Sequence, residues 1–105
     1  MATLYITEYN RMTLDVSGAV VPIGMEPAIT TQTVAISGVS AQSALLNSAT
    51  RFVRIETDTI CHLLWAANPT ATTSHTRLAA SQTEYFGTNP IDVGLGLKIA
   101  VIQGS

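Results

Sequence analysis

The stretch RFVRIETDTICHLLWA, residues 51–66, decides the fold. In its first half, Val53 and Ile55 alternate with Arg54 and Glu56. Strict alternation of apolar and polar residues is typical of a β-strand that buries one face and exposes the other. The sequence therefore predicts a half-buried strand at residues 51–57.

The second half of this stretch predicts a returning strand. Asp58 and Thr59 form a turn signal, and residues 60–66 are apolar on both faces except at His62. Two such runs separated by a tight turn predict an antiparallel hairpin. Because both faces of the second strand are apolar, we expect a second sheet or another chain to cover it.

The rest of the chain follows the same pattern of short strands between turns. Residues 40–49 are interpreted as a loop, with a short helix as the alternative. Residues 70–76 are a predicted loop, and Asn89-Pro90 begins a turn-rich link that runs to Gly96. Further strands are predicted at residues 4–9, 19–23, 31–37, 83–87 and 97–103, and residues 77–80 are predicted as a short strand or a turn. The expected fold is all-β: one domain spanning residues 1–105, an antiparallel β-sandwich or small barrel, jelly-roll-like, of about seven or eight short strands.

The composition indicates a surface suited to assembly. Charged residues make up 11% of the chain, against about 25% in a typical soluble domain. The chain holds 15 Thr, 8 Ser and 13 Ala. A surface of small and hydroxyl residues loses little side-chain entropy on contact and avoids the cost of burying charge.

Charge and hydropathy exclude several classes of partner. The net charge is −2, and the five basic residues are scattered, which argues against nucleic acid. No stretch approaches the roughly 20 apolar residues of a membrane helix, and residues 1–5 lack the pattern of a signal peptide. We therefore expect synthesis in a cytoplasm and no membrane partner.

No motif predicts catalysis, a cofactor or a metal. Cys61 and His62 are adjacent on a strand, so their side chains face opposite sides and do not form a nucleophile–base pair. His75 reads as a solvated loop histidine, and Gly94 with Gly96 is only a fragment of a nucleotide loop. We expect no enzymatic activity and no small-molecule substrate.

Protein contacts are expected on two segments. The first ten residues could form an N-terminal arm or an edge strand added to another chain's sheet, and the two-sided strand at 60–66 could be covered by a partner. Tyr85 and Phe86 are adjacent, so one of them is expected to face outward. The predicted contact residues are Leu4, Tyr5, Ile6, Tyr9, His62, Leu64 and Tyr85.

Several segments resemble small β-rich virion proteins of tailed bacteriophages. They are residues 51–55, 61–72, 77–87 and 97–102, and residues 32–36 upstream also fit the family pattern. The resemblance covers about 70 residues in all. The likeness is a pattern of strands and turns and not a catalytic signature. The chain departs from the family at Ala66 and Ala67, where Gly is frequent, and lacks its Pro in residues 77–80 and its Pro-Gly turn before the last strand. These departures leave the loop geometry open.

The resemblance implies a structural role in the virion. Some members of the group are capsid decoration, or cement, proteins, which bind the major capsid protein and stabilise the head. For this chain it implies a homotrimer on the capsid surface that bridges neighbouring capsid proteins. Two alternatives remain open: a head–tail connector, neck or tail component, and a β module that binds glycans or a host. Trp65 lies in an apolar strand, which weighs against the glycan alternative.

Overall fold

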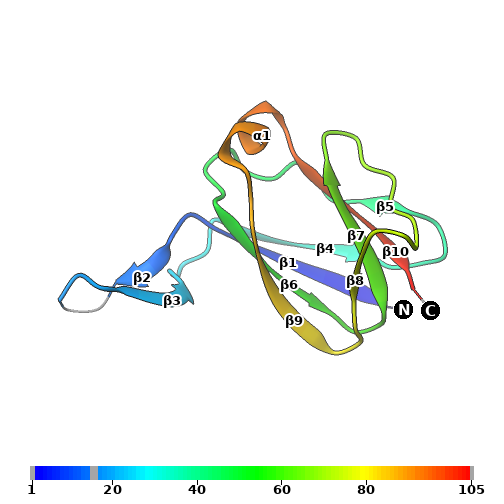
Figure 1. Ribbon diagram of the computed structural model, residues 1–105, viewed down its shortest axis with the longest axis horizontal. Helices are drawn as coiled ribbons and strands as arrows, with labels where there is room; N and C mark the ends of the chain where they lie inside the picture. Colours follow the sequence, from blue (N-terminus) through cyan, green and yellow to red (C-terminus); the bar gives the residue numbers. More distant parts are fainter. Residues whose placement is uncertain (1, 15–16, 105) are drawn as a thin grey trace.

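Two four-stranded antiparallel sheets form the body of the protein (Figure 1). The computed structural model describes residues 2–14 and 17–104, and gives the backbone alone at 13 and 20–23. The first sheet has the order β4-β1-β6-β9 and the second the order β5-β10-β7-β8. The fold is thus an all-β sandwich of two separate sheets, as the sequence predicts, and not a closed barrel.

Each strand is short, and the bounds are as follows. The first sheet contains β4 (Thr30–Ala35), β1 (Thr3–Tyr9), β6 (Phe52–Thr57) and β9 (Gln82–Gly87). The second contains β5 (Ala41–Gln42), β10 (Lys98–Gln103), β7 (Cys61–Ala66) and β8 (Thr76–Leu78). A separate hairpin pairs β2 (Met12–Leu14) with β3 (Val20–Gly24), and one helix, α1, spans Pro90–Leu95.

Side-chain alternation builds the core between the two sheets. Leu4 and Ile6 of β1 and Ile55 of β6 are each 0% exposed and face the second sheet. Leu63 of β7 and Ile99 of β10 meet them from the other side. Each such side chain contributes roughly 1.5–3 kcal/mol on burial, so this layer is the main source of stability.

The predicted hairpin at residues 51–66 is wrong in its pairing. Both strands exist, but β6 pairs with β1 and β9, whereas β7 pairs with β10 and β8. The turn between them crosses from one sheet to the other, and the hydroxyl of Thr57 donates to the carbonyl oxygen of Thr59 within it. The two strands face each other across the core instead of sharing a ladder.

The N-terminal strand is also placed differently from the expectation. Residues 3–9 are neither an arm nor an edge strand, because β1 is hydrogen-bonded to β4 on one side and β6 on the other. Met1 lies outside the described residues. With Leu4 and Ile6 committed to the core, β1 is the strand around which the first sheet is organised.

Residues 89–96 contain a short helix where a turn-rich link was expected. The side chain of Asn89 accepts a hydrogen bond from the amide of Ile91 at 2.9 Å, and Pro90 occupies the first turn. Both are standard signals for a helix N-terminus. Val93 is buried and anchors α1 to the sandwich.

Candidate functional site

The seven predicted contact residues fall into three groups. Leu4 and Ile6 are fully buried in the chain's own core, so this part of the prediction is corrected: their side chains are inaccessible to a partner. Tyr5, Tyr9 and Tyr85 belong to the outer face of the first sheet, opposite the core. His62 and Leu64 belong to the outer face of the second sheet. The structure therefore does not bring the predicted residues together on one surface.

On the first sheet, an aromatic row crosses the outer face. The rings of Tyr9 and Phe52 stack at 5.2 Å, and Phe52 meets Tyr85 at 6.2 Å. Tyr9 is only 5% exposed, whereas Tyr5 and Tyr85 are 45% and 52% exposed. Of the predicted residues, Tyr5 and Tyr85 thus present the largest accessible aromatic surface.

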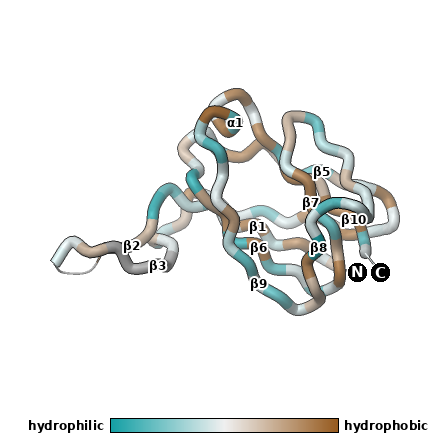
Figure 2. Tube along the Cα trace, in the orientation of Figure 1, coloured by the Kyte–Doolittle hydropathy of each residue, from teal (hydrophilic) through white to brown (hydrophobic). Residues whose placement is uncertain are grey.

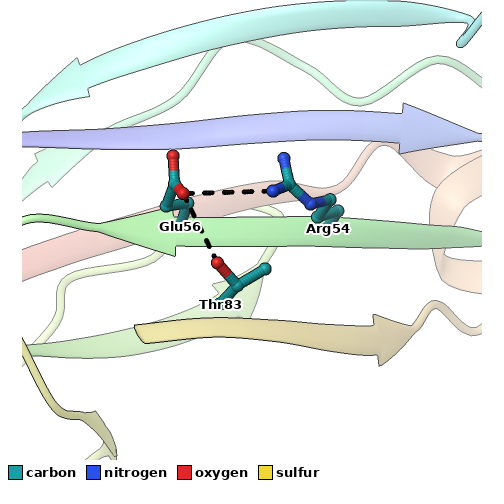
Figure 3. A network of polar contacts seen from close by, with 3 residues as sticks. All are labelled: Arg54, Glu56 and Thr83. Carbon is teal, nitrogen blue, oxygen red and sulfur yellow. Dashed lines mark hydrogen bonds and ion pairs between the residues drawn. The ribbon is translucent and has the colours of Figure 1, made fainter. Parts of the chain in front are cut away.

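The centre of this face carries a polar network beside Tyr5. The guanidinium of Arg54 lies 3.9 Å from the carboxylate of Glu56, which also accepts a weak hydrogen bond from the hydroxyl of Thr83 at 3.5 Å (Figure 3). A shallow depression of about 340 Å³ is lined by Tyr5, by these two charged side chains of β6 and by residues 31–33 of β4. Both charged side chains are well exposed, so the pair contributes at most about 1 kcal/mol.

On the second sheet, the chain's own loop supplies cover. The Nδ1 of His62 lies 3.0 Å from the carbonyl oxygen of His75, which requires Nδ1 to carry the proton and donate. Gln42 donates to the carbonyl oxygen of Pro69, and Ser40 accepts from the amide of Ala71. The loop after β7 is therefore fastened to this sheet, and His62 is only 6% exposed.

The Cys61 and His62 side chains point to opposite faces, as the sequence predicts. Cys61 belongs to the core, where its thiol lies 3.7 Å from the hydroxyl of Thr57. Burial raises the pKa of the Cys61 thiol, and this disfavours the thiolate that a nucleophile requires. Within residues 2–14 and 17–104, no three His, Cys, Asp or Glu residues gather as metal ligands would.

Trp65 forms no exposed platform. Its ring packs against Phe86 at 4.8 Å and is half-buried. Its indole N–H is buried without a hydrogen-bond partner among the described residues. Of the Tyr85–Phe86 pair, Tyr85 faces outward and Phe86 packs against the core.

The β2–β3 hairpin is a surface that sequence reasoning missed. It projects from one end of the sandwich, at the left of Figure 1, along the molecule's 47 Å long axis. Met12 and Leu14 on β2 are 43% and 48% exposed. Its two strands pack mainly against each other, and a lone two-stranded hairpin is only marginally stable in water. We call residues 12–24 the arm.

The base of the arm is held in a defined position. The hydroxyl of Tyr9 donates to the carboxylate of Glu26 at 2.6 Å, and the amide of Met25 donates to the carbonyl oxygen of Arg11. Gly24 packs under the Tyr9 ring so closely that a Cβ there would lie 2.5 Å from it. Glu26, by accepting this hydrogen bond, and burial together raise the pKa of Tyr9 to about 12.

A second apolar surface surrounds α1. Ile91 and Leu95 are 73% and 82% exposed and lie four residues apart on one side of the helix. Leu45, 58% exposed, lies beside Gly96, where a Cβ would be 3.4 Å from the leucine side chain. Figure 2 shows hydrophobic colouring on α1, at the top of the view. We call Leu45, Ile91 and Leu95 the helix patch.

Comparisons with protein-family models, with curated proteins and with solved structures find no match. Among the described residues, no helix has both the length and the apolar character needed to span a bilayer. The arm and the helix patch are therefore identified from the geometry of this chain alone.

Proposed function

We propose that the chain is a capsid decoration protein of a tailed bacteriophage. It binds the outside of the head, bridges neighbouring major capsid proteins and stabilises the shell. In this role it has no catalytic activity, and it is made in the host cytoplasm before joining the virion. The resemblance described above suggests a major capsid protein as the partner, and the arm is the surface that we expect to contact it.

The observation that carries the proposal is the exposed apolar side of the arm. Met12 and Leu14 lie on a strand pair that projects from the sandwich and whose strands pack mainly against each other. Apolar side chains on a projecting element are typical of segments that become buried on a neighbouring protein. Binding that occurs only on the assembled shell stabilises that shell by linkage.

The helix patch offers a second contact of the same character. Leu45, Ile91 and Leu95 lie on the sandwich itself, separate in the chain from the arm. A protein that bridges two capsid subunits needs two contact surfaces, and these two hold five of the eight large hydrophobic residues that are exposed in the described part of the chain. The low charge of the chain reduces the desolvation cost of burying them.

Binding to undecorated heads of the phage that encodes the chain tests this proposal. We expect the wild type to bind in a shell-like copy number and to raise the temperature at which the heads open. The double variant Met12→Asp/Leu14→Asp should bind at least about tenfold more weakly, because each carboxylate would have to be buried at the contact.

Val39→Asp is the matched control. Val39 is also exposed and apolar, at 74%, but lies in the loop after β4, outside both the arm and the helix patch. It should bind like the wild type. Absence of binding by the wild type contradicts the proposal, and a copy number of about a dozen or fewer per particle would point instead to a neck or tail component.

A further inference from the structure

β4 is an edge strand with unpaired backbone groups. The amide of Ile36 donates to the carbonyl oxygen of Ala2, and this bond shows which residues of β4 direct their backbone groups toward β1. Alternation along an antiparallel ladder then directs the N–H and C=O groups of Thr31, Thr33 and Ala35 away from β1. All three residues are exposed, and within the described part of the chain these groups have no hydrogen-bond partner.

This edge lacks the usual protection against pairing. Natural edge strands carry charges, prolines or bulges that prevent another chain from adding to the sheet. β4 reads TTQTVA, without charge or proline, and its register with β1 is continuous over all six residues. The opposite edge strand, β9, has Glu84 opposite the core residue Ile55, which is a protective charge of that kind.

From this contrast we propose that two copies of the chain pair through β4 about a two-fold axis, joining their first sheets into one eight-stranded sheet. Centred on Thr33, the pairing places Thr33 opposite Thr33 of the second copy and Thr31 opposite Ala35. Every outward N–H and C=O group of these residues then finds a partner in the second copy.

The side chains of β4 are compatible with this symmetric contact. A two-fold axis through Thr33 places that residue beside its own copy, so a charge at this position would repel itself. Thr31, Thr33 and Ala35 are small and uncharged, and they lie side by side on the outer face. Gln32 is already engaged with the backbone of Ala44 inside its own chain, so pairing leaves that contact in place.

The pairing also determines where the arms lie. The arm joins the N-terminal end of β4, at the left of Figure 1. Because the paired β4 strands run in opposite directions, the two arms project from opposite ends of the dimer. The inference stands independently of the proposed function, since the free edge exists whatever the arm binds. A dimer differs from the homotrimer that the resemblance implies, and the mass in solution distinguishes the two.

The mass in solution tests the inference. Light scattering on the wild type, from about 1 µM to about 1 mM, should reach twice the mass of the 11.1-kDa chain. Thr33→Lys places two like charges together, and Thr33→Pro removes an outward N–H that the monomer does not use. We expect each to raise the dissociation constant at least about tenfold.

Thr83→Lys is the matched control, because Thr83 is an outer-face threonine on the opposite edge strand of the same sheet. It should dimerise like the wild type. Hydrogen exchange should slow at Thr31, Thr33 and Ala35 in the wild-type dimer, and circular dichroism checks that each variant folds. If Thr33→Pro fails to fold, the dissociation constant of Thr33→Lys tests the inference by itself. A wild type that stays monomeric or forms a trimer, or a Thr33→Lys variant that dimerises normally, overturns the inference.

Discussion

Glu8 is a carboxyl group on the core side of β1 that is 0% exposed. Its Oε1 accepts from the amide of Asn47 at 2.7 Å and from the hydroxyl of Thr50 at 2.8 Å. The amide of Gln32 lies 3.4 Å from its other oxygen. These contacts fasten the loop before β6 to β1. In the sequence, Glu8 is one of several scattered acidic residues, and nothing local marks it as buried.

Glu8→Ala should therefore destabilise the fold. It leaves the buried Thr50 hydroxyl without its acceptor, at a cost of about 1–3 kcal/mol, and also removes the part-buried contact with the Asn47 amide. Glu8→Gln keeps one carbonyl oxygen and should cost less. Urea unfolding measures both, with Glu84→Gln, an exposed site, as the control expected within about 0.5 kcal/mol of the wild type. Equal stability of Glu8→Ala and the control would contradict this role.

Tyr9 makes the fold sensitive to alkaline pH. Its phenol has a pKa of about 12 in the folded protein, against 10.0 for the free group, because it donates to Glu26 and is buried. A folded pKa above the unfolded one means that the stabilisation is complete below pH 10 and is lost as pH rises through 12. The loss should appear as a fall in the free energy of unfolding across that window.

The variant Tyr9→Phe isolates this effect. It should remove one ionisation near pH 12 from the ultraviolet titration of tyrosinate and flatten the alkaline decline in stability. Tyr85→Phe, at an exposed tyrosine, is the control and should leave that step in place. If the step near pH 12 persists in Tyr9→Phe, the hydrogen bond to Glu26 does not govern the phenol.

At the scale of elements, local patterns predict strands but not their partners. Alternation at residues 51–57 correctly predicts β6, since burial of one face is encoded in each strand by itself. Pairing depends on contacts far along the chain, such as Tyr9 with Phe52, which no local signal reveals. The turn at 58–60 looks like a hairpin turn, yet it crosses between sheets. The apolar character of β7 on both faces was the available clue.

The contact surfaces were missed for a related reason. The sequence predicts a strand at 19–23. Its partner β2 is only three residues long, which is too short for an alternating pattern of apolar and polar residues to be recognised. An apolar strand also reads the same whether it is buried or exposed, so Met12 and Leu14 carry no mark of their exposure. The pair Asn89-Pro90 is interpreted above as a turn, although Asn and Pro also begin helices, and Gly94 and Gly96 disfavour a helix.

For the whole molecule, the arm should be separable from the sandwich. The buried core residues that the structure describes all lie outside residues 12–24, and the arm's strands pack mainly on each other. Arg11 and Met25 are already joined by a backbone hydrogen bond. Replacing residues 12–24 with Asn-Gly, the preferred two-residue hairpin turn, closes the chain at that point without altering either sheet.

We expect this deletion to unfold in one urea transition with a free energy within about 1 kcal/mol of the wild type, because the sandwich loses none of its core. Ile55→Ala, which empties part of the core, should cost about 2–5 kcal/mol in the same assay and shows that it detects lost packing. On the proposed function, the deletion also loses head binding, whereas dimerisation through β4 persists. A deletion that fails to fold would mean that the arm supports the sandwich, and its exposed apolar residues would then need another explanation than a partner.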